Sequence, residues 1–283
     1  MSAIITLITD FGLSDAYVAV IKGVILNTNP KAQVVDICHA IEPQNVTQAA
    51  FVLSTAYPYF PKKTIHLVVV DPEVGTLRRA IILRTPSADF VAPDNGVLSY
   101  VITQSLNRSV EARGQSSIKE GTKTGENIEA VAITNSRFWR LPVSATFHGR
   151  DIFAPVAAAL SLGSPPIEFG EPIDSVVTLP LPRPHKISDG TLVGHILHID
   201  SFGNLITDIK SDTLALKAEH IAIEVSGQFI CGLSGTYAEG SGLLALIGSN
   251  GYMEIALKTG SASAMLDARV GDEVKVRKHS RGS

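Results

Sequence analysis

The chain has 283 residues, of which 45% are hydrophobic and 18% charged, with a formal net charge of −3. This length is more than one hydrophobic core usually serves, so we expect one large and one small domain. The small negative charge excludes a global positive field of the kind that attracts nucleic acid or an anionic membrane surface.

The start of the chain and its cysteines predict where the protein works. Residues 3–8 are apolar, follow no basic leader and stop at Asp10, which indicates a first strand and not a signal peptide. No stretch approaches the length of a membrane span. Cys38 and Cys231 lie far apart in apolar runs, so we interpret them as buried thiols of a reducing compartment. We therefore expect a cytoplasmic protein.

The first 160 residues alternate short apolar runs with helical patterns. Helices are predicted at about 15–27, with Ser14 or Asp15 as cap, and at 46–57, 97–103 and 152–160. Strands are predicted at 3–8, 34–38, 65–70, 80–84, 90–92 and 130–134. This alternation predicts an α/β domain with a mostly parallel central sheet and helices on both faces.

An acidic turn follows the predicted strand 65–70. Asp71 stands where this apolar strand ends, and Pro72 and Gly75 then form a turn that brings Arg78 back toward it. Ligands of open α/β sheets bind at the carboxyl ends of the strands. A turn of this kind on its own is more often a solvated loop, so a functional interpretation depends on other stretches.

Two of those stretches lie elsewhere in the same domain. Asp10 ends the first strand and Asp15 follows near a helix start, so the two carboxylates could bind a metal or hold a ribose diol, unless Asp15 is only a helix cap. His148 lies beside Gly149 at a loop-to-helix junction, where a helix amino terminus and a close backbone approach are available. The alternative is that His148 only caps the helix.

Two segments carry little periodicity. Residues 105–127 are polar, and we expect a surface excursion or flexible insertion there. Six prolines between 163 and 184 indicate a domain linker. The predicted boundaries are 1–170 for the α/β domain, 171–188 for the linker, 189–278 for a second domain and 279–283 for a disordered tail.

The second domain reads as short strands joined by Gly or Asn turns, which predicts a compact antiparallel β barrel or sandwich. His195 and His198 are three apart on one strand and so point to opposite faces, which disfavours a joint metal site. The turn 200–204 combines an acid, an aromatic and an amide. Ser249 lies in a second turn, for which a plain hairpin is the simpler interpretation.

Together these motifs resemble one family. The chain resembles the S-adenosylmethionine (SAM) hydrolases, also called SAM hydroxide adenosyltransferases, which are relatives of the SAM-dependent fluorinase and chlorinase. The resemblance runs through nearly the whole chain, apart from residues 105–127. The motifs that carry it are Thr9-Asp10-Phe11-Gly12, the turn from Asp71 to Arg78, Ala92-Pro93-Asp94-Asn95-Gly96, Phe147-His148-Gly149-Arg150-Asp151 and Asp200 to Asn204.

The resemblance implies an activity. Members of the family cleave SAM to adenosine and L-methionine by attack of water or hydroxide on the ribose 5′ carbon. The Asp-Arg-His triad that marks the hydrolytic branch falls on Asp71, Arg78 and His148. The halogenases carry tyrosines at the places of Asp71 and His148, which argues against halide as nucleophile, while Gly149 is also found in the chlorinase. SAM is then the substrate, and neither a metal nor another cofactor is expected.

The resemblance also implies binding residues and an assembly. Asp10 would hold the ribose hydroxyls, with Asn95 as a weaker candidate in the same region. Family members form homotrimers whose sites lie between subunits. The expected contacts to SAM also include Phe147, Gly149, Asp200, Phe202, Asn204 and Ser249.

Three alternatives stay open at this point. A chlorinase-like halogenase would use the same pocket with a halide. A metal-dependent phosphohydrolase would place Asp10, Asp15 and Asp71 around magnesium, and a chelator would then abolish its activity. A SAM or adenosine sensor would use the same cleft without turnover. No nucleic-acid or membrane partner is expected.

Overall fold

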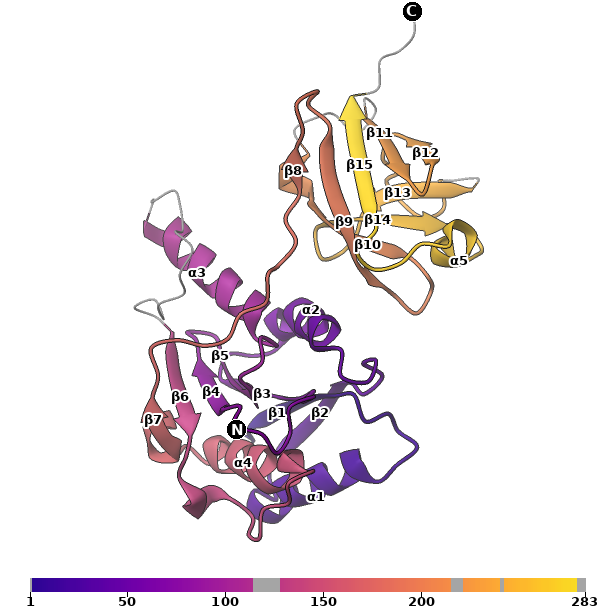
Figure 1. Cartoon of the computed structure of the whole chain (residues 1–283). Coiled ribbons are helices and arrows are strands. Elements are labelled where there is room, and N and C mark those ends of the chain that lie inside the picture. Colours follow the sequence, from indigo (N-terminus) through magenta and orange to yellow (C-terminus); the bar gives the residue numbers. More distant parts are fainter. Residues whose placement is uncertain (1, 114–127, 215–220, 240–241, 279–283) are drawn as a thin grey trace, which may run out of the picture. The chain divides into compact units, whose positions relative to one another are not determined.

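The computed structural model describes residues 2–113, 128–214, 221–239 and 242–278. The backbone divides into two compact units, Met1–Leu179 and Pro180–Ser283. The expected fold class is confirmed: unit 1 is an α/β unit and unit 2 is an antiparallel β unit (Figure 1).

Unit 1 is built on a seven-stranded sheet in the order β2-β1-β3-β5-β4-β6-β7. Its strands are β1 (Ile4–Thr9), β2 (Gln33–Cys38), β3 (Thr64–Val69), β4 (Ala80–Arg84), β5 (Ala88–Pro93), β6 (Glu129–Ile133) and β7 (Gly170–Pro172). The pairs β2–β1, β1–β3 and β3–β5 are parallel, and the other three pairs are antiparallel. The sheet is therefore mixed, with a parallel core.

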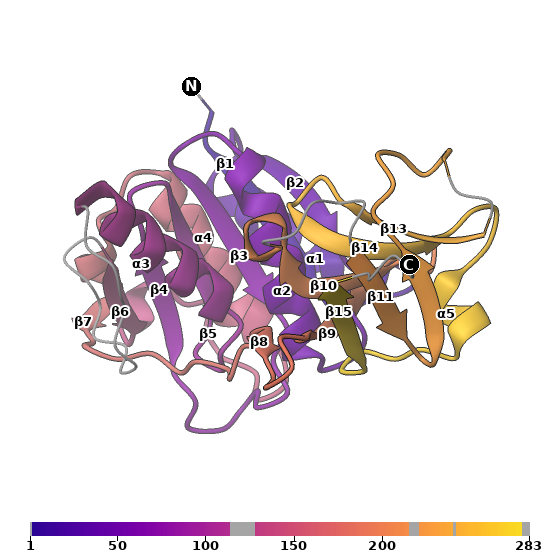
Figure 2. The same cartoon turned by 90° about the horizontal axis from the view of Figure 1, so that it is seen from above.

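Helices cover both faces of this sheet (Figure 2). One face carries α1 (Tyr17–Thr28) and α4 (Ala154–Ser161), which contact each other, and the other carries α2 (Val46–Ala56) and α3 (Ser99–Arg113). All six residues of β3 are buried between these layers. Such a strand needs apolar residues on both faces, which explains its continuous apolar run. Shorter turns lie at Tyr57–Tyr59, Ser136–Phe138 and Pro166–Phe169 (3-10) and at Gly149–Phe153 (π).

Two predicted helix boundaries were wrong. Helix α1 begins at Tyr17, and its N-cap is Ala16 without a side-chain hydrogen bond, so neither Ser14 nor Asp15 caps it. Helix α3 continues to Arg113 through part of the predicted polar excursion, because extending an existing helix adds one hydrogen bond for each residue ordered. The rest of that excursion and the predicted tail, 279–283, lie outside the described residues.

Unit 2 is an antiparallel sheet in the order β12-β11-β15-β9-β10-β14-β13, with β8 beside β9. The end strands β12 and β13 contact each other, so the sheet nearly closes into a barrel around an apolar core. A helix that the sequence did not predict, α5 (Ala262–Leu266), and a 3-10 turn, Ser211–Thr213, complete it. The strands are β8 (His185–Lys186), β9 (Leu192–Ile199), β10 (Leu205–Lys210), β11 (Ile221–Val225), β12 (Gln228–Cys231), β13 (Leu243–Ile247), β14 (Tyr252–Leu257) and β15 (Glu273–Lys278).

None of the helices within the described ranges has the length and apolar character that crossing a lipid bilayer requires.

Candidate active site

The parallel pairing of β1 with β3 brings two predicted acidic residues to one edge of the sheet. Thr9 is in register with Val69, so Asp10 and the residues after Val69 leave neighbouring strands at the same carboxyl end. Asp71 lies two residues beyond β3. This edge is where open α/β sheets place their ligands.

Asp71, Arg78 and His148 form one hydrogen-bonded cluster. The Nε of Arg78 donates to both carboxylate oxygens of Asp71, at 2.8 and 3.0 Å, and its Nη2 also donates to Oδ2. The same Nη2 lies 2.9 Å from Nδ1 of His148. The side chains of Asp71 and Arg78 are each 5% exposed, so this ion pair is shielded from solvent. Arg78 thus holds the carboxylate and the imidazole at fixed positions.

The cluster determines the state of His148. Burial lowers the pKa of His148 and the Arg78 charge lowers it further, against the opposing effect of the Asp71 and Asp151 carboxylates. The imidazole is therefore neutral at neutral pH. Because a guanidinium can only donate, Nδ1 must be the acceptor, and we assign the ring proton to Nε2.

Close backbone packing holds the two segments of the cluster together. A Cβ on Gly75 would lie 2.4 Å from the carbonyl oxygen of Ala145, and a Cβ on Gly149 would lie 2.9 Å from Cγ1 of Val69. Gly75 therefore lets the turn after β3 meet the His148 loop, and Gly149 lets that loop pack on the end of β3. The Arg78 guanidinium in turn lies over the Phe153 ring, 5.1 Å from its centroid.

Asp151 fixes the loop that carries His148. It is fully buried, accepts two hydrogen bonds from Arg150 at 2.7 Å, and accepts one from the Ser144 amide at 2.9 Å. Burial by itself would raise the pKa of Asp151, but these bonds outweigh it and lower the pKa. Asp151 is therefore more than a charge at a helix start, because it ties the two ends of the loop together.

Asp10 and Asn95 lie at the same edge with different partners. Oδ2 of Asp10 accepts a hydrogen bond from the Gln44 amide at 2.8 Å. The Asn95 amide donates to the carbonyl of Val70 at 3.0 Å, and its oxygen accepts from the Val97 amide at 3.2 Å. The Asn95 side chain is thus engaged in supporting the segment that leads to Asp71. The Gln44 amide was missed from the sequence, because a backbone donor carries no residue signature.

An aromatic cluster lies next to His148. Phe147 contacts Phe11 and Tyr17, with ring centroids 5.8 and 5.3 Å apart, and Tyr17 is 49% exposed. An exposed aromatic cluster next to a polar site is a surface on which a flat ligand can pack. Phe147 was a predicted binding residue, while Phe11 and Tyr17 were not. Their only signal was the presence of two aromatic residues soon after the first strand.

Carboxylates do not gather into a metal site in the part of the chain that the structure describes. There, no group of three or more His, Cys, Asp or Glu side chains is placed to hold an ion. Asp15, which the sequence suggested as a partner of Asp10, is exposed.

The predicted residues of unit 2 fall at two places. Asp200 organises the β9–β10 turn: Oδ1 accepts from the amides of Phe202 and Asn204, and Oδ2 accepts from the Asn204 side chain, all at 2.9 Å. Phe202 is 76% exposed. Ser249 lies before β14, whose Tyr252 pairs with Lys210 at the far end of β10. Ser249 is therefore at the opposite end of β10 from Asp200.

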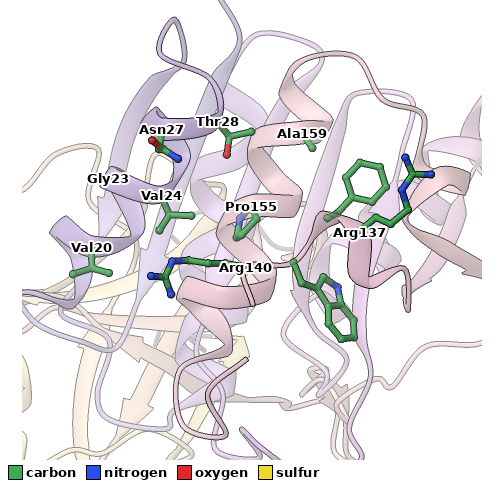
Figure 3. Close-up of a pocket in the computed structure, with 11 residues that line it drawn as sticks. Val20, Gly23, Val24, Asn27, Thr28, Arg137, Arg140, Pro155 and Ala159 are labelled. Atoms are coloured by element: carbon green, nitrogen blue, oxygen red, sulfur yellow. The ribbon is translucent and has the colours of Figure 1, made fainter. Parts of the chain in front are cut away.

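Among the pockets that the described residues of unit 1 line, two are similar in volume. One, of about 520 Å³, is lined by residues of the turn that carries Arg78, by Asp94 and by Val177. The other, of about 530 Å³, lies between α1, α4 and the segment 137–140, and none of the predicted site residues lines it (Figure 3). Proximity to the cluster therefore favours the first pocket as part of the site.

The fold and the cluster define an α/β enzyme-like unit with a carboxylate–guanidinium–imidazole site, followed by a β unit. The family model described as the SAM hydroxide adenosyltransferase N-terminal domain matches residues 5–170, and that of the C-terminal domain matches residues 194–275. The chain therefore belongs to the SAM hydroxide adenosyltransferase family, as its motifs indicated.

Similarity to individual proteins agrees with this family membership. An (R)-S-adenosyl-L-methionine hydrolase of Salinispora tropica is 35% identical over 274 residues, covering 96% of this chain and 97% of the relative. A fluorinase of Nocardia brasiliensis is 26% identical, covering 97% and 96%. The crystal structure of an uncharacterized conserved protein from Thermotoga maritima superimposes with a TM-score of 0.82 at 35% identity, covering 96% and 99%.

The state of His148 predicts an acid limb in the pH profile of any reaction at this site. Its pKa lies below the ordinary 6.5, so protonation begins only in acid, and it places a charged ring against Arg78. We expect kcat to be level above neutrality and to fall only at a pH below the ordinary histidine pKa. The His148→Asn variant keeps an acceptor near the place of Nδ1 but does not titrate, so its residual activity should lack this limb. The same fall of kcat in acid in the wild type and in His148→Asn would contradict the assignment of the acid limb to His148.

Proposed function

We propose that this protein hydrolyses S-adenosyl-L-methionine to adenosine and L-methionine, with water attacking the ribose 5′ carbon in line with the departing sulfur. The observation that carries the proposal is the shielded Asp71–Arg78–His148 cluster at the carboxyl edge of the sheet. Membership of the family and the (R)-S-adenosyl-L-methionine hydrolase relatives support the choice of substrate.

The chemistry needs little beyond an oriented water. The leaving group is a neutral thioether that departs from a sulfonium, so no general acid is required. A carboxylate has about four acceptor positions, and Asp71 accepts three hydrogen bonds from Arg78, which leaves room for one from water. Water can donate to that position and a halide cannot, which favours hydrolysis over halogenation. Neutral His148, protonated at Nε2, can hold the same water from a second direction.

The remaining residues would bind the two ends of the substrate. Asp10 uses one carboxylate oxygen for Gln44 and has the other for a ribose hydroxyl, which would hold the 5′ carbon in place. Phe147 would pack against the substrate with Phe11 and Tyr17, and Gly149 would allow the close approach. The remaining predicted residues would hold the adenine and methionine ends of the substrate: Asp200, Phe202, Asn204 and Ser249. Their separation along β10 suits an extended substrate.

The central role of Asp71 predicts the effect of neutralising it. We expect Asp71→Asn to reduce kcat at least about 100-fold, because the amide cannot replace the carboxylate that orients water. Glu171→Gln is a control, since Glu171 is an exposed carboxylate of the same unit on β7, at the other edge of the sheet. Adenosine and methionine are followed by chromatography in halide-free buffer with EDTA. No adenosine from the wild type, full activity of Asp71→Asn, or a 5′-halo product only with added halide would overturn the proposal.

We further propose a homotrimer in which unit 1 of one subunit and unit 2 of its neighbour complete each site. The division of the binding residues between the two units supports this. We expect a mass in solution of three times the 30.1 kDa of one chain. Mixed trimers of Asp71→Asn and Phe202→Ala chains should regain activity, because some sites then combine two unchanged halves. A monomeric mass, or no recovery after subunit exchange, would contradict the arrangement.

A further inference from the structure

Beside the cluster lies a second buried network that the proposed reaction does not use directly. We propose that His39 is a positioning residue for Asp10, acting through the Thr9 hydroxyl and through the backbone between β2 and α2. The inference rests on the proposed function, in which Asp10 holds the ribose. It goes beyond that function because it assigns what keeps Asp10 in place.

The first link is a hydrogen bond between two buried side chains. His39 is 6% exposed and Thr9 is fully buried. Nδ1 of His39 lies 2.8 Å from Oγ1 of Thr9, and the same Oγ1 accepts a hydrogen bond from the Phe11 amide at 3.3 Å. Thr9 precedes Asp10 and Phe11 follows it. The Thr9 hydroxyl therefore links the residues before and after Asp10, and its hydrogen bond with His39 orients this hydroxyl.

The opposite side of the ring faces a carboxylate whose charge, and not a hydrogen bond, favours one tautomer. Nε2 of His39 lies 3.1 Å from Oδ1 of Asp36, and the other oxygen of Asp36 accepts from Lys22 Nζ at 2.5 Å. Burial alone would raise the pKa of Asp36, but Lys22 and His39 lower it, so Asp36 is a carboxylate at neutral pH. A carboxylate favours the ring proton on the nitrogen that faces it. Nδ1 is then left as an acceptor for the Thr9 hydroxyl.

The second link is the backbone from His39 to Gln44. The carbonyl of His39 accepts from the Gly12 amide at 2.8 Å, which ties the residue to the segment just after Asp10. At the other end, the Gln44 amide donates to Oδ2 of Asp10 at 2.8 Å. Gln44 has a φ of +66°, which is uncommon for a residue other than glycine. Such strain is found where a backbone group must point at a functional partner.

The structure supplies a control for a purely structural role. Thr6, on the same strand β1, is also fully buried and lies 2.7 Å from Nδ1 of the buried His66. This Thr6–His66 pair has the same chemistry as the Thr9–His39 pair, but it lies in the middle of the strand, away from Asp10. Breaking either Thr–His hydrogen bond removes a buried contact, but only the Thr9–His39 bond lies next to the Asp10 carboxylate.

The test compares Thr9→Val with Thr6→Val, since valine has nearly the shape of threonine without the hydroxyl. We expect both to lower the melting temperature, but only Thr9→Val to raise the KM for SAM and the Kd for adenosine, by about tenfold, the effect of one net hydrogen bond. Because Asp10 would contact the ribose in the ground state and the transition state alike, we expect the change in KM to exceed any change in kcat. Thr9→Ser keeps the hydroxyl and should restore wild-type affinity.

A second pair of variants tests His39 itself. His39→Asn places an amide near the position of Nδ1 and can still pair with Thr9, whereas His39→Gln reaches only toward Asp36. We expect His39→Asn to retain adenosine affinity better than His39→Gln. Equal KM and Kd in Thr9→Val and Thr6→Val, or better affinity in His39→Gln, would overturn the inference.

The KM for SAM depends on turnover and the Kd for adenosine does not, so the two measurements test the proposed function and this inference separately. Adenosine binding, measured by calorimetry, does not depend on turnover. If the wild type formed no adenosine from SAM, the proposed function would fail, while the adenosine affinities would still decide whether His39 positions Asp10.

Discussion

The parallel pairing of β1 with β3 is the constraint on which the site depends. It makes two neighbouring strands end together, so Asp10 and the Asp71 turn leave the sheet side by side. Every residue of β3 is buried between helices on both faces, so the register of this pair is held by the core itself. The carboxylates are therefore positioned by a rigid element, and only short turns separate them from it.

Arg78 connects this edge to the rest of the site. Its guanidinium bonds Asp71 and His148 at once, and it rests on Phe153. Removing one partner of such a shielded pair typically costs about 3–5 kcal/mol, because the other charge is left buried and unpaired. The pair is better regarded as a source of fixed geometry than of net stability. Fixed geometry is also what attack on the ribose 5′ carbon requires, since no strong acid or base is involved.

The sequence predicted the parts of the fold that depend on pattern. Continuous apolar runs identified the buried strands, and acidic residues at their ends identified Asp10 and Asp71. Helix boundaries were less predictable: α1 begins at Tyr17 although Ser14 and Asp15 are better caps, because its first turn is set by packing of Val18 and Ile21 in the core. The extent of α3 was missed because its later residues have no apolar periodicity.

The site was predictable as residue types but not as contacts. Gly75 and Gly149 were visible in the sequence, yet the backbone approaches that require them depend on which loops meet. Asn95 was expected near the ribose, and its side chain bonds the backbone at Val70 and Val97, contacts that the residue type alone does not specify. The Gln44 amide that holds Asp10 has no sequence signal at all. The roles of these residues in binding SAM stay predictions.

The most direct test of the account is to run the reaction in water enriched in oxygen-18. Attack of water on the ribose 5′ carbon predicts one oxygen-18 atom in the 5′ hydroxyl of adenosine and none in methionine, as read by mass spectrometry of both products. Label in the amino acid, release of 5′-methylthioadenosine, or unlabelled adenosine would contradict water attack at this carbon, and with it the role given to the Asp71–Arg78–His148 cluster.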